Sequence, residues 1–285
     1  MRIGLDIMGG DNAPDATLEG AFLASKSLKS NERIVLVGDK NLATNWFSKN
    51  NIDFSLFDYI HADQSVEMNE HATKALRKKP NNSISIGFKA LKNKEIDVFS
   101  SAGNSGAMLV GSMFSIGPIK GVIRPSITSV LPKEDGSVGL ILDVGVNADC
   151  KPDVLFQFAV LGSLFAENIY NIKTPKVGLL NIGEEKGKGN LLTQAAYELL
   201  EDNDDINFIG NVEGRDLFSN KVDVVVCDGF TGNVVLKQAE AFYSLIAKRK
   251  LMDDYFERFN YEIYGGTPVL GLDGNVLIGH GISNG

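Results

Sequence analysis

The sequence predicts an α/β fold built on a mostly parallel, doubly wound sheet. Short apolar runs recur along the chain, and each is followed by glycine or a polar turn and then by a helical pattern. The runs at 34–37 and 224–226 are apolar without alternation, which is typical of strands covered on both faces. Alternation of strands and helices in this manner favours a parallel sheet with crossover helices.

The predicted strands are short, and most of them end at glycine or at a polar residue. In chain order they are Arg2–Met8, Arg33–Gly38, Asp97–Ser100, Gly139–Val144, Lys176–Ile182, Asn207–Gly210, Val222–Cys227 and Asn275–Ile278.

Helical patterns fill the intervals between these strands. Pro14 suits the first position of a helix, where the N–H that proline lacks is not needed. Ser105–Phe114 and Pro152–Asn168 predict two further helices, and Thr231–Asn260 is typical of one long helix or a helical pair. The glycine-rich stretch Tyr264–Gly274 predicts a loop.

Composition sets the size of the domain and the compartment. With 285 residues and no evident linker, we expect a single α/β domain over 1–285 with a helical protrusion around 234–260. No apolar run is long enough to span a bilayer, and the N-terminus enters a strand pattern without a signal-peptide layout, so we expect a cytoplasmic protein. The two cysteines, Cys150 and Cys227, lack CxxC spacing and predict buried free thiols.

The net charge of −8 argues against nucleic-acid binding, which needs a basic surface. It also means that an anionic substrate must be held by local donors, because the overall field of the protein repels it.

Four strand-to-helix turns are rich in glycine and polar residues, and in open parallel sheets such turns bind ligands. The first runs from Asp6 to Asp11 and on to Pro14. Gly9 and Gly10 allow close approach to the backbone, although a plain tight turn explains this turn equally well.

The second turn, Ser100-Ser-Ala-Gly-Asn-Ser-Gly-Ala107, ends a strand in small residues. Gly103 turns the chain, and Asn104 or Ser105 can cap the helix that follows. A helix start with free N–H groups and hydroxyls is a ready anion site, and a capped helix without a ligand is the alternative.

The third turn, Asn181-Ile-Gly-Glu-Glu-Lys-Gly-Lys-Gly-Asn190, places three glycines around Lys186 and Lys188 after an apolar strand. Its spacing matches neither a P-loop nor a dinucleotide fingerprint, which argues against ATP and NAD. The alternative is a solvated charged turn.

The fourth turn, Cys227-Asp-Gly-Phe-Thr-Gly-Asn233, follows a buried strand and precedes the long helical segment.

Two basic clusters, Arg77-Lys78-Lys79 and Lys248-Arg249-Lys250, are open to two interpretations. Each is either a solvated helix surface or a contact for an anion, and the second cluster also suits an acidic partner or anionic lipid.

The sequence lacks the patterns of several other mechanisms. His61, His71 and His280 show no metal-binding spacing, there is no GxSxG elbow, and neither cysteine has a base beside it in sequence. We therefore expect no metal and no cofactor. Several anion sites without a protein nucleophile indicate that the bound anion is itself the nucleophile.

The chain resembles the bacterial acyl-acyl-carrier-protein:phosphate acyltransferases of phospholipid synthesis (PlsX family). The resemblance covers the whole chain in order. The blocks that carry it are Asp-Ile-Met-Gly-Gly-Asp at 6–11, Ser-Ala-Gly-Asn-Ser-Gly-Ala at 101–107, Arg-Pro at 124–125, Leu-Asp-Val-Gly-Val-Asn-Ala-Asp-Cys-Lys-Pro at 142–152, Val-Gly-Leu-Leu-Asn-Ile-Gly-Glu-Glu at 177–185, Lys-Gly-Asn at 188–190, Phe-Ile-Gly-Asn-Val-Glu-Gly-Arg-Asp at 208–216, Val-Val-Cys-Asp-Gly-Phe-Thr-Gly-Asn at 225–233, Tyr-Gly-Gly at 264–266 and Gly-His-Gly at 279–281.

The resemblance implies a three-layer, Rossmann-like fold of the isocitrate dehydrogenase and phosphate acetyltransferase kind. It implies a homodimer that takes acyl carrier protein as acyl donor and inorganic phosphate as acceptor. The acyl-phosphate product would pass to a membrane glycerol-phosphate acyltransferase, with peripheral contact at the inner face of the cell membrane.

By the same resemblance, Lys188 and Asn233 are the expected catalytic residues. The turns supply the expected phosphate and substrate contacts, which are Asp6, Gly9, Gly10, Asp11, Gly103, Asn104, Ser105, Gly106, Asn147, Asn181, Gly183, Glu185, Gly189, Asp228, Gly229, Thr231 and Gly232. In the predicted mechanism, the Gly103–Gly106 and Gly229–Asn233 turns hold the phosphate or the thioester oxygen. Lys188 neutralises the developing charge, and Asn147 and Asn181 orient their neighbours.

Two departures from the family pattern concern the membrane. Between Lys237 and Tyr264 the chain is shorter than family members, which carry an apolar helical tip there, and it stops at Ser283-Asn-Gly285 where they continue into a helix.

Two other functions stay open. One is a phosphate acetyl- or butyryltransferase that uses a coenzyme A thioester, and the other is a non-catalytic scaffold for the membrane acyltransferase.

Overall fold

A computed structural model describes residues 1–282, of which 261 and 262 are described by their backbone alone. The end of the chain at 283–285, where the family continues into a helix, lies outside the described residues. The chain divides into two compact units, one of Met1–Ile119 with Tyr264–Gly285 and the other of Lys120–Ile263. The single domain expected over 1–285 stays a prediction.

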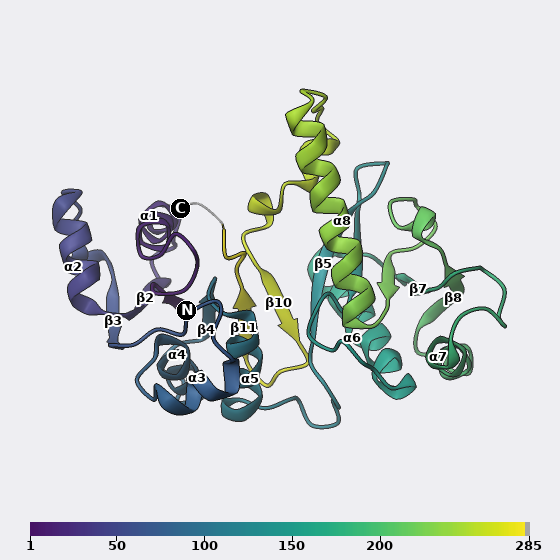
Figure 1. Cartoon of the computed structure of the whole chain (residues 1–285), viewed down its shortest axis with the longest axis horizontal. Coiled ribbons are helices and arrows are strands. Elements are labelled where there is room, and N and C mark those ends of the chain that lie inside the picture. Colours follow the sequence, from purple (N-terminus) through teal and green to yellow (C-terminus); the bar gives the residue numbers. More distant parts are fainter. Residues whose placement is uncertain (283–285) are drawn as a thin grey trace. The chain divides into compact units, whose positions relative to one another are not determined.

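The first unit contains a six-stranded sheet in the order β3-β2-β1-β4-β11-β10 (Figure 1). All neighbouring strands run parallel except β10, which is antiparallel to β11. Its elements are β1 (Arg2–Asp6), α1 (Asp15–Ser25), β2 (Arg33–Gly38), α2 (Lys40–Lys49), η1 (Phe54–Leu56), β3 (Asp58–His61), α3 (Ala72–Lys78), α4 (Ser83–Lys92), β4 (Val98–Ser101), α5 (Ser105–Ser115), β10 (Thr267–Leu270) and β11 (Asn275–Ile278).

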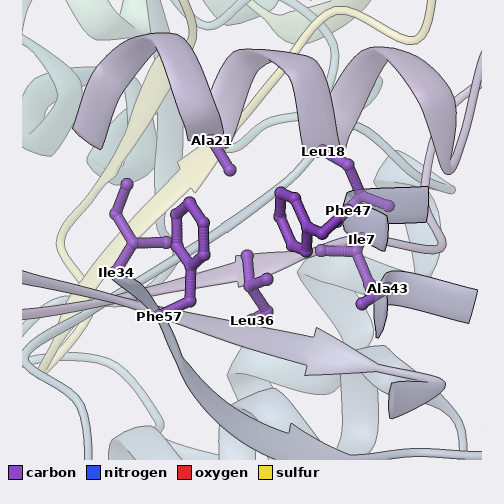
Figure 2. Close-up of a cluster of buried hydrophobic side chains, with 8 residues drawn as sticks. All are labelled: Ile7, Leu18, Ala21, Ile34, Leu36, Ala43, Phe47 and Phe57. Carbon is purple, nitrogen blue, oxygen red and sulfur yellow. The ribbon is translucent and has the colours of Figure 1, made fainter. Parts of the chain in front are cut away.

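Burial explains the first unit's apolar runs. The Ile-Val-Leu-Val run of β2 is buried along its whole length, as expected of a strand covered on both faces. On one face, Ile34 and Leu36 pack with Leu18 of α1 and Phe47 of α2 in the cluster of Figure 2. The rings of Phe47 and Phe57 stack there with centroids 4.9 Å apart.

The second unit contains a five-stranded sheet in the order β5-β6-β9-β7-β8. Strands β6, β9, β7 and β8 are parallel, and β5 is antiparallel to β6. Its elements are β5 (Ser126–Pro132), β6 (Val138–Leu142), α6 (Pro152–Tyr170), β7 (Lys176–Leu180), α7 (Leu191–Glu201), β8 (Asn207–Val212), η2 (Gly214–Asp216), β9 (Val224–Val226), α8 (Gly229–Lys248) and η3 (Phe256–Phe259), and η4 (Tyr261–Tyr264) spans the point in sequence where the unit ends.

The two faces of the second sheet are covered by different helices. Gly162 of α6 lies against Val224 and Leu142, because a Cβ at that glycine would come within 2.6 Å and 2.8 Å of their methyl groups. On the other face, Val225 packs in the cluster to which Val235 of α8 also belongs. The doubly wound arrangement predicted from the sequence is therefore confirmed.

Most predicted elements are confirmed, β2 and β11 with the same bounds. The loop predicted at Tyr264–Gly274 is wrong, because it contains β10. Strands β3 and β5 were not predicted. In β5 the polar Ser126 and Thr128 are buried, so the strand shows no apolar run.

The start of α1 differs from the prediction, because Pro14 is its N-cap rather than its first residue. Of the two alternatives predicted for Thr231–Asn260, the helical pair is confirmed, because α8 ends at Lys248 and the short η3 follows.

Candidate active site

The carboxyl ends of β6, β9, β7 and β8 lie at one edge of the second unit's sheet, because these strands are parallel neighbours. The third and fourth glycine-rich turns and the segment around Asn147 all start at this edge. Open parallel sheets bind ligands at such an edge, at the point where neighbouring strands send their helices to opposite faces.

Asp143, which follows β6, organises the centre of this edge. Its carboxylate is fully buried and accepts hydrogen bonds from the backbone N–H groups of Ile127 (3.1 Å), Val146 (3.1 Å) and Asn147 (2.6 Å), and from the Asn147 side-chain amide (2.9 Å). Burial raises the pKa of Asp143, and these N–H donors oppose the rise. The Asn147 amide also donates to the carbonyl of Pro125 at 2.8 Å, so this predicted site residue positions the turn by way of Asp143.

The start of α8 is packed directly onto this centre. A Cβ at Gly232 would lie 1.9 Å from the Asp143 carbonyl oxygen, and one at Gly229 would lie 2.8 Å from the Asp143 carboxylate. Both positions therefore require glycine. Asp228 caps the helix and accepts from the backbone N–H and the hydroxyl of Thr231, at 2.8 Å and 2.9 Å.

Asn233 lies one turn into α8, where its side-chain amide donates to the carbonyl of Val144 at 3.2 Å. This bond anchors Asn233 beside the turn that follows β6. The amide oxygen of Asn233 remains the acceptor end of the side chain.

A pair of asparagines shapes the turn after β7. The Asn181 amide donates to the Lys188 carbonyl (3.1 Å) and to the side chain of Asn211 (3.0 Å), which donates in turn to the Glu185 carbonyl (3.0 Å). At Gly189 the backbone φ is +97°, and a Cβ there would lie 2.4 Å from the Asn181 side-chain oxygen.

The two lysines of this turn have different surroundings. Lys186 forms an ion pair with Glu201. Lys188 is exposed, and among the residues that the structure describes its ammonium group has no carboxylate within ion-pair distance. Its stem lies over Gly183, where a Cβ would come within 3.0 Å of the Lys188 Cγ. Lys188 is therefore the lysine of this turn that is available to an anion.

The first unit has a comparable edge, where β1 and β4 end side by side. The Asp6 carboxylate is buried and accepts from the Ser101 hydroxyl at 2.7 Å, and the Ser101 oxygen accepts from the Gly103 N–H at 3.0 Å. A Cβ at Gly9 would lie within 2.7 Å of all three of these groups. Burial raises the pKa of Asp6, as it does for Asp143.

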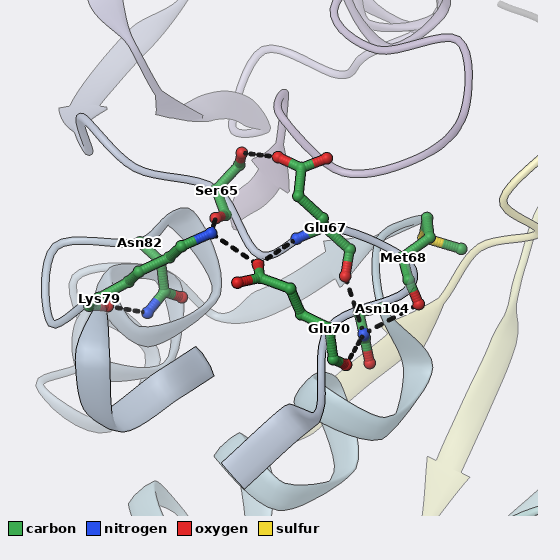
Figure 3. Close-up of polar contacts among 7 residues, drawn as sticks. All are labelled: Ser65, Glu67, Met68, Glu70, Lys79, Asn82 and Asn104. Carbon is green, nitrogen blue, oxygen red and sulfur yellow. Dashed lines mark hydrogen bonds and ion pairs between the residues drawn. The ribbon is translucent and has the colours of Figure 1, made fainter. Parts of the chain in front are cut away.

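Asn104 caps α5 by accepting from the Ala107 N–H at 2.9 Å. Its amide nitrogen donates to three carbonyls of the preceding loop, those of Glu67 (3.0 Å), Met68 (3.2 Å) and Glu70 (3.0 Å), as Figure 3 shows. Both ends of the Asn104 side chain are therefore hydrogen-bonded within the protein.

Lys79, which belongs to the basic cluster predicted at the end of a helix, forms an ion pair. It contacts the Glu70 carboxylate at 2.6 Å and the Ser65 carbonyl at 2.9 Å, which fixes the loop that Asn104 holds (Figure 3). The hydrogen bond from Lys79 lowers the pKa of Glu70, and the charge of Lys79 is a smaller cause. Of the remaining predicted contacts, Ser105 and Gly106 are exposed on the first turn of α5, and the Asp11 N–H donates to the Gly281 carbonyl at 2.7 Å.

The structure thus sorts the predicted site residues into two groups. Lys188, Asn233, Asn147, Asn181, Gly183, Glu185, Gly189, Asp228, Gly229, Thr231 and Gly232 belong to the second unit's edge, and Asp6, Gly9, Gly10, Asp11, Gly103, Asn104, Ser105 and Gly106 belong to the first unit's edge.

Sequence reasoning missed three residues that support these edges, namely Asp143, Ser101 and Asn211. Asp143 and Ser101 could have been found, because each lies at the end of a predicted strand next to a glycine-rich turn. Asn211 has no local signal, because its role depends on the pairing of β8 with β7.

Neither cysteine has the character of a nucleophile. Burial raises the pKa of Cys150 to about 12, with the charges of Asp143 and Asp228 as smaller causes. Burial also raises the pKa of Cys227 well above its ordinary value. Both groups are therefore neutral thiols near pH 7.

These features define an α/β protein with two glycine-rich polar edges and an available lysine at one of them. The solved structures that it resembles have the same fold. A phosphotransacetylase from Streptococcus pyogenes matches with a TM-score of 0.69 at 16% identity, over 97% of this chain and 87% of that one. The EutD phosphotransacetylase from Staphylococcus aureus matches with a TM-score of 0.63 at 15% identity, over 99% and 89%.

Sequence comparison adds the family. The profile of the family described as fatty acid synthesis protein matches residues 1–258. The phosphate acyltransferase of Dictyoglomus turgidum is 41% identical over 99% of this chain and 89% of its own length. That of Acetivibrio thermocellus is 43% identical over 100% and 88%. The chain belongs to this phosphate acyltransferase family, so the predicted family and the predicted class of enzyme, an acyltransferase of lipid metabolism, are confirmed.

Proposed function

We propose that this chain transfers an acyl group from the thioester of acyl carrier protein to inorganic phosphate, and that the acyl phosphate feeds phospholipid synthesis. The observation that carries the proposal is the second unit's edge. There, an acidic protein presents the exposed Lys188, which has no carboxylate within ion-pair distance among the described residues, beside the start of α8, and both features suit a small anion.

The chemistry needs little acid–base help. Phosphate is partly dianionic at pH 7, because the second ionisation of phosphate groups lies close to neutral pH. One of its oxygens attacks the thioester carbon, a carbon–oxygen bond forms, and the carbon–sulfur bond breaks. The departing thiol has a pKa of about 8.5, so it leaves as a thiolate that later takes a proton from water. The neutral state of Cys150 and Cys227 agrees with direct attack by phosphate.

The protein contributes placement and charge stabilisation. Holding two reactants in line supplies on the order of 7–11 kcal/mol, and one oxyanion donor adds roughly 3–4 kcal/mol. We assign Lys188 to the charge that develops on phosphate or on the thioester oxygen. Asn233 and the Gly229–Gly232 turn hold the reacting group, and Asn181 and Asn211 hold the turn that carries Lys188. In the first unit, the Gly103–Gly106 turn is a second proposed anion contact.

The proposed partners are the acyl carrier protein as donor, a second copy of the chain in a homodimer, and a membrane glycerol-phosphate acyltransferase that consumes the product. Among the described residues, none of the helices combines the length and hydropathy needed to cross a bilayer. We propose peripheral contact with anionic lipid at the end of α8, where Lys248, Arg249 and Lys250 are followed by the exposed Leu251. Sedimentation with phosphatidylglycerol vesicles, against neutral vesicles, tests this contact.

The test of the reaction is to incubate the protein with acyl-acyl-carrier-protein, with and without phosphate, and to trap acyl phosphate with hydroxylamine. We expect phosphate-dependent loss of thioester and equal formation of hydroxamate. A parallel arm with acyl-coenzyme A identifies the donor. Binding of the carrier without any phosphate-dependent loss of thioester would instead indicate the scaffold function.

A further inference from the structure

A largely apolar groove runs along α8 in the second unit. It encloses about 510 Å³, and its walls are one side of α8, the residues that follow β8, and the aromatic residues of and beside η3. Among the described residues that line the groove, none carries a formal charge, and their side chains are aliphatic or aromatic apart from Gln238 and the tyrosine hydroxyls.

One end of the groove is formed by residues that come shortly after the proposed active-site edge in sequence. Val234, which lines it, follows Asn233 directly on α8, and Gly214, which also lines it, comes two residues after the end of β8. From Val234 the lining continues to Ile246, a distance of about 18 Å at roughly 1.5 Å per helical residue. One end of the groove therefore lies by the same sheet edge as Lys188.

The wall opposite α8 is held in place by ring contacts. The Phe218 and Phe259 rings have centroids 5.3 Å apart, those of Tyr255 and Phe259 are 5.5 Å apart, and the Tyr255 hydroxyl donates to the Pro132 carbonyl at 3.2 Å. These contacts anchor η3 to the β5–β6 hairpin independently of anything that occupies the groove.

The turns at the edge also expose large apolar side chains beside their polar ones. Ile182 and Leu191 flank the Lys188 turn and are 82% and 87% exposed, and Phe230 at the start of α8 is 67% exposed. Inorganic phosphate makes no apolar contact with such side chains, whereas an acyl chain can pack against them.

We infer that this groove is the binding site for the acyl chain of the thioester donor, with the carbonyl end at the Asn233 end of α8 and the chain running toward Ile246. The inference rests on the proposed function. A water molecule in the liquid takes about 30 Å³, so the groove has room for a chain on the order of a dozen or more methylene groups. Each methylene buried there raises the affinity about fourfold.

The first test is equilibrium binding of unreactive acyl amides of increasing length, from about four to sixteen carbons. We expect affinity to rise by roughly fourfold per methylene and then to level off. A flat series would overturn the inference. Because this readout requires no turnover, a failure of the proposed reaction is seen separately, as absence of acyl phosphate at every chain length.

The second test fills the groove. Ala239 lines the groove midway along α8, whereas Ala241 is exposed on the same helix outside it. We expect Ala239→Trp to lower the ratio of long-chain to short-chain affinity at least tenfold and to move the optimum to shorter chains, and Ala241→Trp to keep the wild-type ratio. Equal ratios in the two variants would contradict the assignment.

A further variant guards against misfolding of the tryptophan substitution. Phe242 lines the groove but is 55% exposed, so Phe242→Ser is compatible with folding. It should weaken long-chain binding several-fold and leave the binding of four-carbon amides within twofold. Should Ala239→Trp and Phe242→Ser instead change the oligomeric state and keep the wild-type chain-length profile, the groove would be a contact between copies of the chain and the inference would be wrong.

Discussion

The two units place a buried aspartate at the same point of their sheets, at the carboxyl end of a parallel strand. Asp6 is the last residue of β1 in one unit and Asp143 follows β6 in the other, and both fix glycine-containing turns by accepting hydrogen bonds. The surroundings differ. In the first unit, Asn104 and Lys79 are committed to loop carbonyls and Glu70, whereas the second unit keeps Lys188 available. A buried carboxylate at such an edge is thus a sign of a fixed turn, whereas Lys188, the residue we propose for the chemistry, is exposed on a neighbouring turn that Asn181 and Asn211 hold.

The close packing of Gly232 against Asp143 predicts the largest effect on stability. In Gly232→Ala, the new methyl group would lie 1.9 Å from the Asp143 carbonyl oxygen, so α8 must move. We expect a loss of about 4 kcal/mol of unfolding free energy by urea denaturation. The matched change Gly106→Ala in α5, where the nearest atom is 3.3 Å away, should alter stability by less than about 1 kcal/mol. Similar losses in both variants would contradict the assigned packing.

The two aspartates provide the next comparison. Asp143→Asn turns an acceptor of four hydrogen bonds into a group that presents N–H to N–H donors, which should cost about 3 kcal/mol. Asp6→Asn, which disturbs the bonds from Ser101 and the Met8 N–H, should cost about 2 kcal/mol. A stable Asp143→Asn protein would show that this carboxylate is not what fixes its turn.

Catalysis should distinguish the two lysines of one turn. Lys188→Ala should lower turnover about a hundredfold, equivalent to roughly 2.7 kcal/mol, with the fold intact by circular dichroism. Lys186→Ala removes an exposed ion pair with Glu201 and a cation–π contact with Tyr197, and should stay within about twofold of wild type. Near-normal formation of acyl phosphate by Lys188→Ala would rule out its proposed role.

The thiols give the smallest effect. With the pKa of Cys150 raised to about 12 from an ordinary 9.0, the folded state binds the proton more tightly than the unfolded state. Its contribution to stability is complete below pH 9 and is lost as the pH rises toward 12. Native protein at pH 8 should react with iodoacetamide at least tenfold more slowly than the urea-unfolded chain. Equal rates would mean that the thiols are exposed or ionised.

Much of this fold follows from local sequence. The buried run of β2 and the glycine-rich turns after β1, β4, β7 and β9 were predicted because burial on both faces and tight turns leave local signals. Strand β10 was missed, since Pro268 and the glycines around it mask a short strand that is defined by its pairing with β11.

The sequence identified many residues of the candidate site correctly, but it did not predict what each of them contacts. The sequence pointed to Asn147 as a substrate contact, and the structure shows its amide bound to Asp143 and Pro125. The difference between Lys186 and Lys188 depends on Glu201 at the end of α7, which is distant in sequence from the turn. Long-range partners of this kind cannot be read from a motif.

The measurement that tests the central claim most directly is a titration of the protein with inorganic phosphate, followed by phosphorus NMR. Wild type and Lys186→Gln should bind phosphate saturably with matching affinity, and Lys188→Gln should bind at least tenfold more weakly. Undiminished binding by Lys188→Gln would contradict the claim that an acidic protein gathers its phosphate at this lysine.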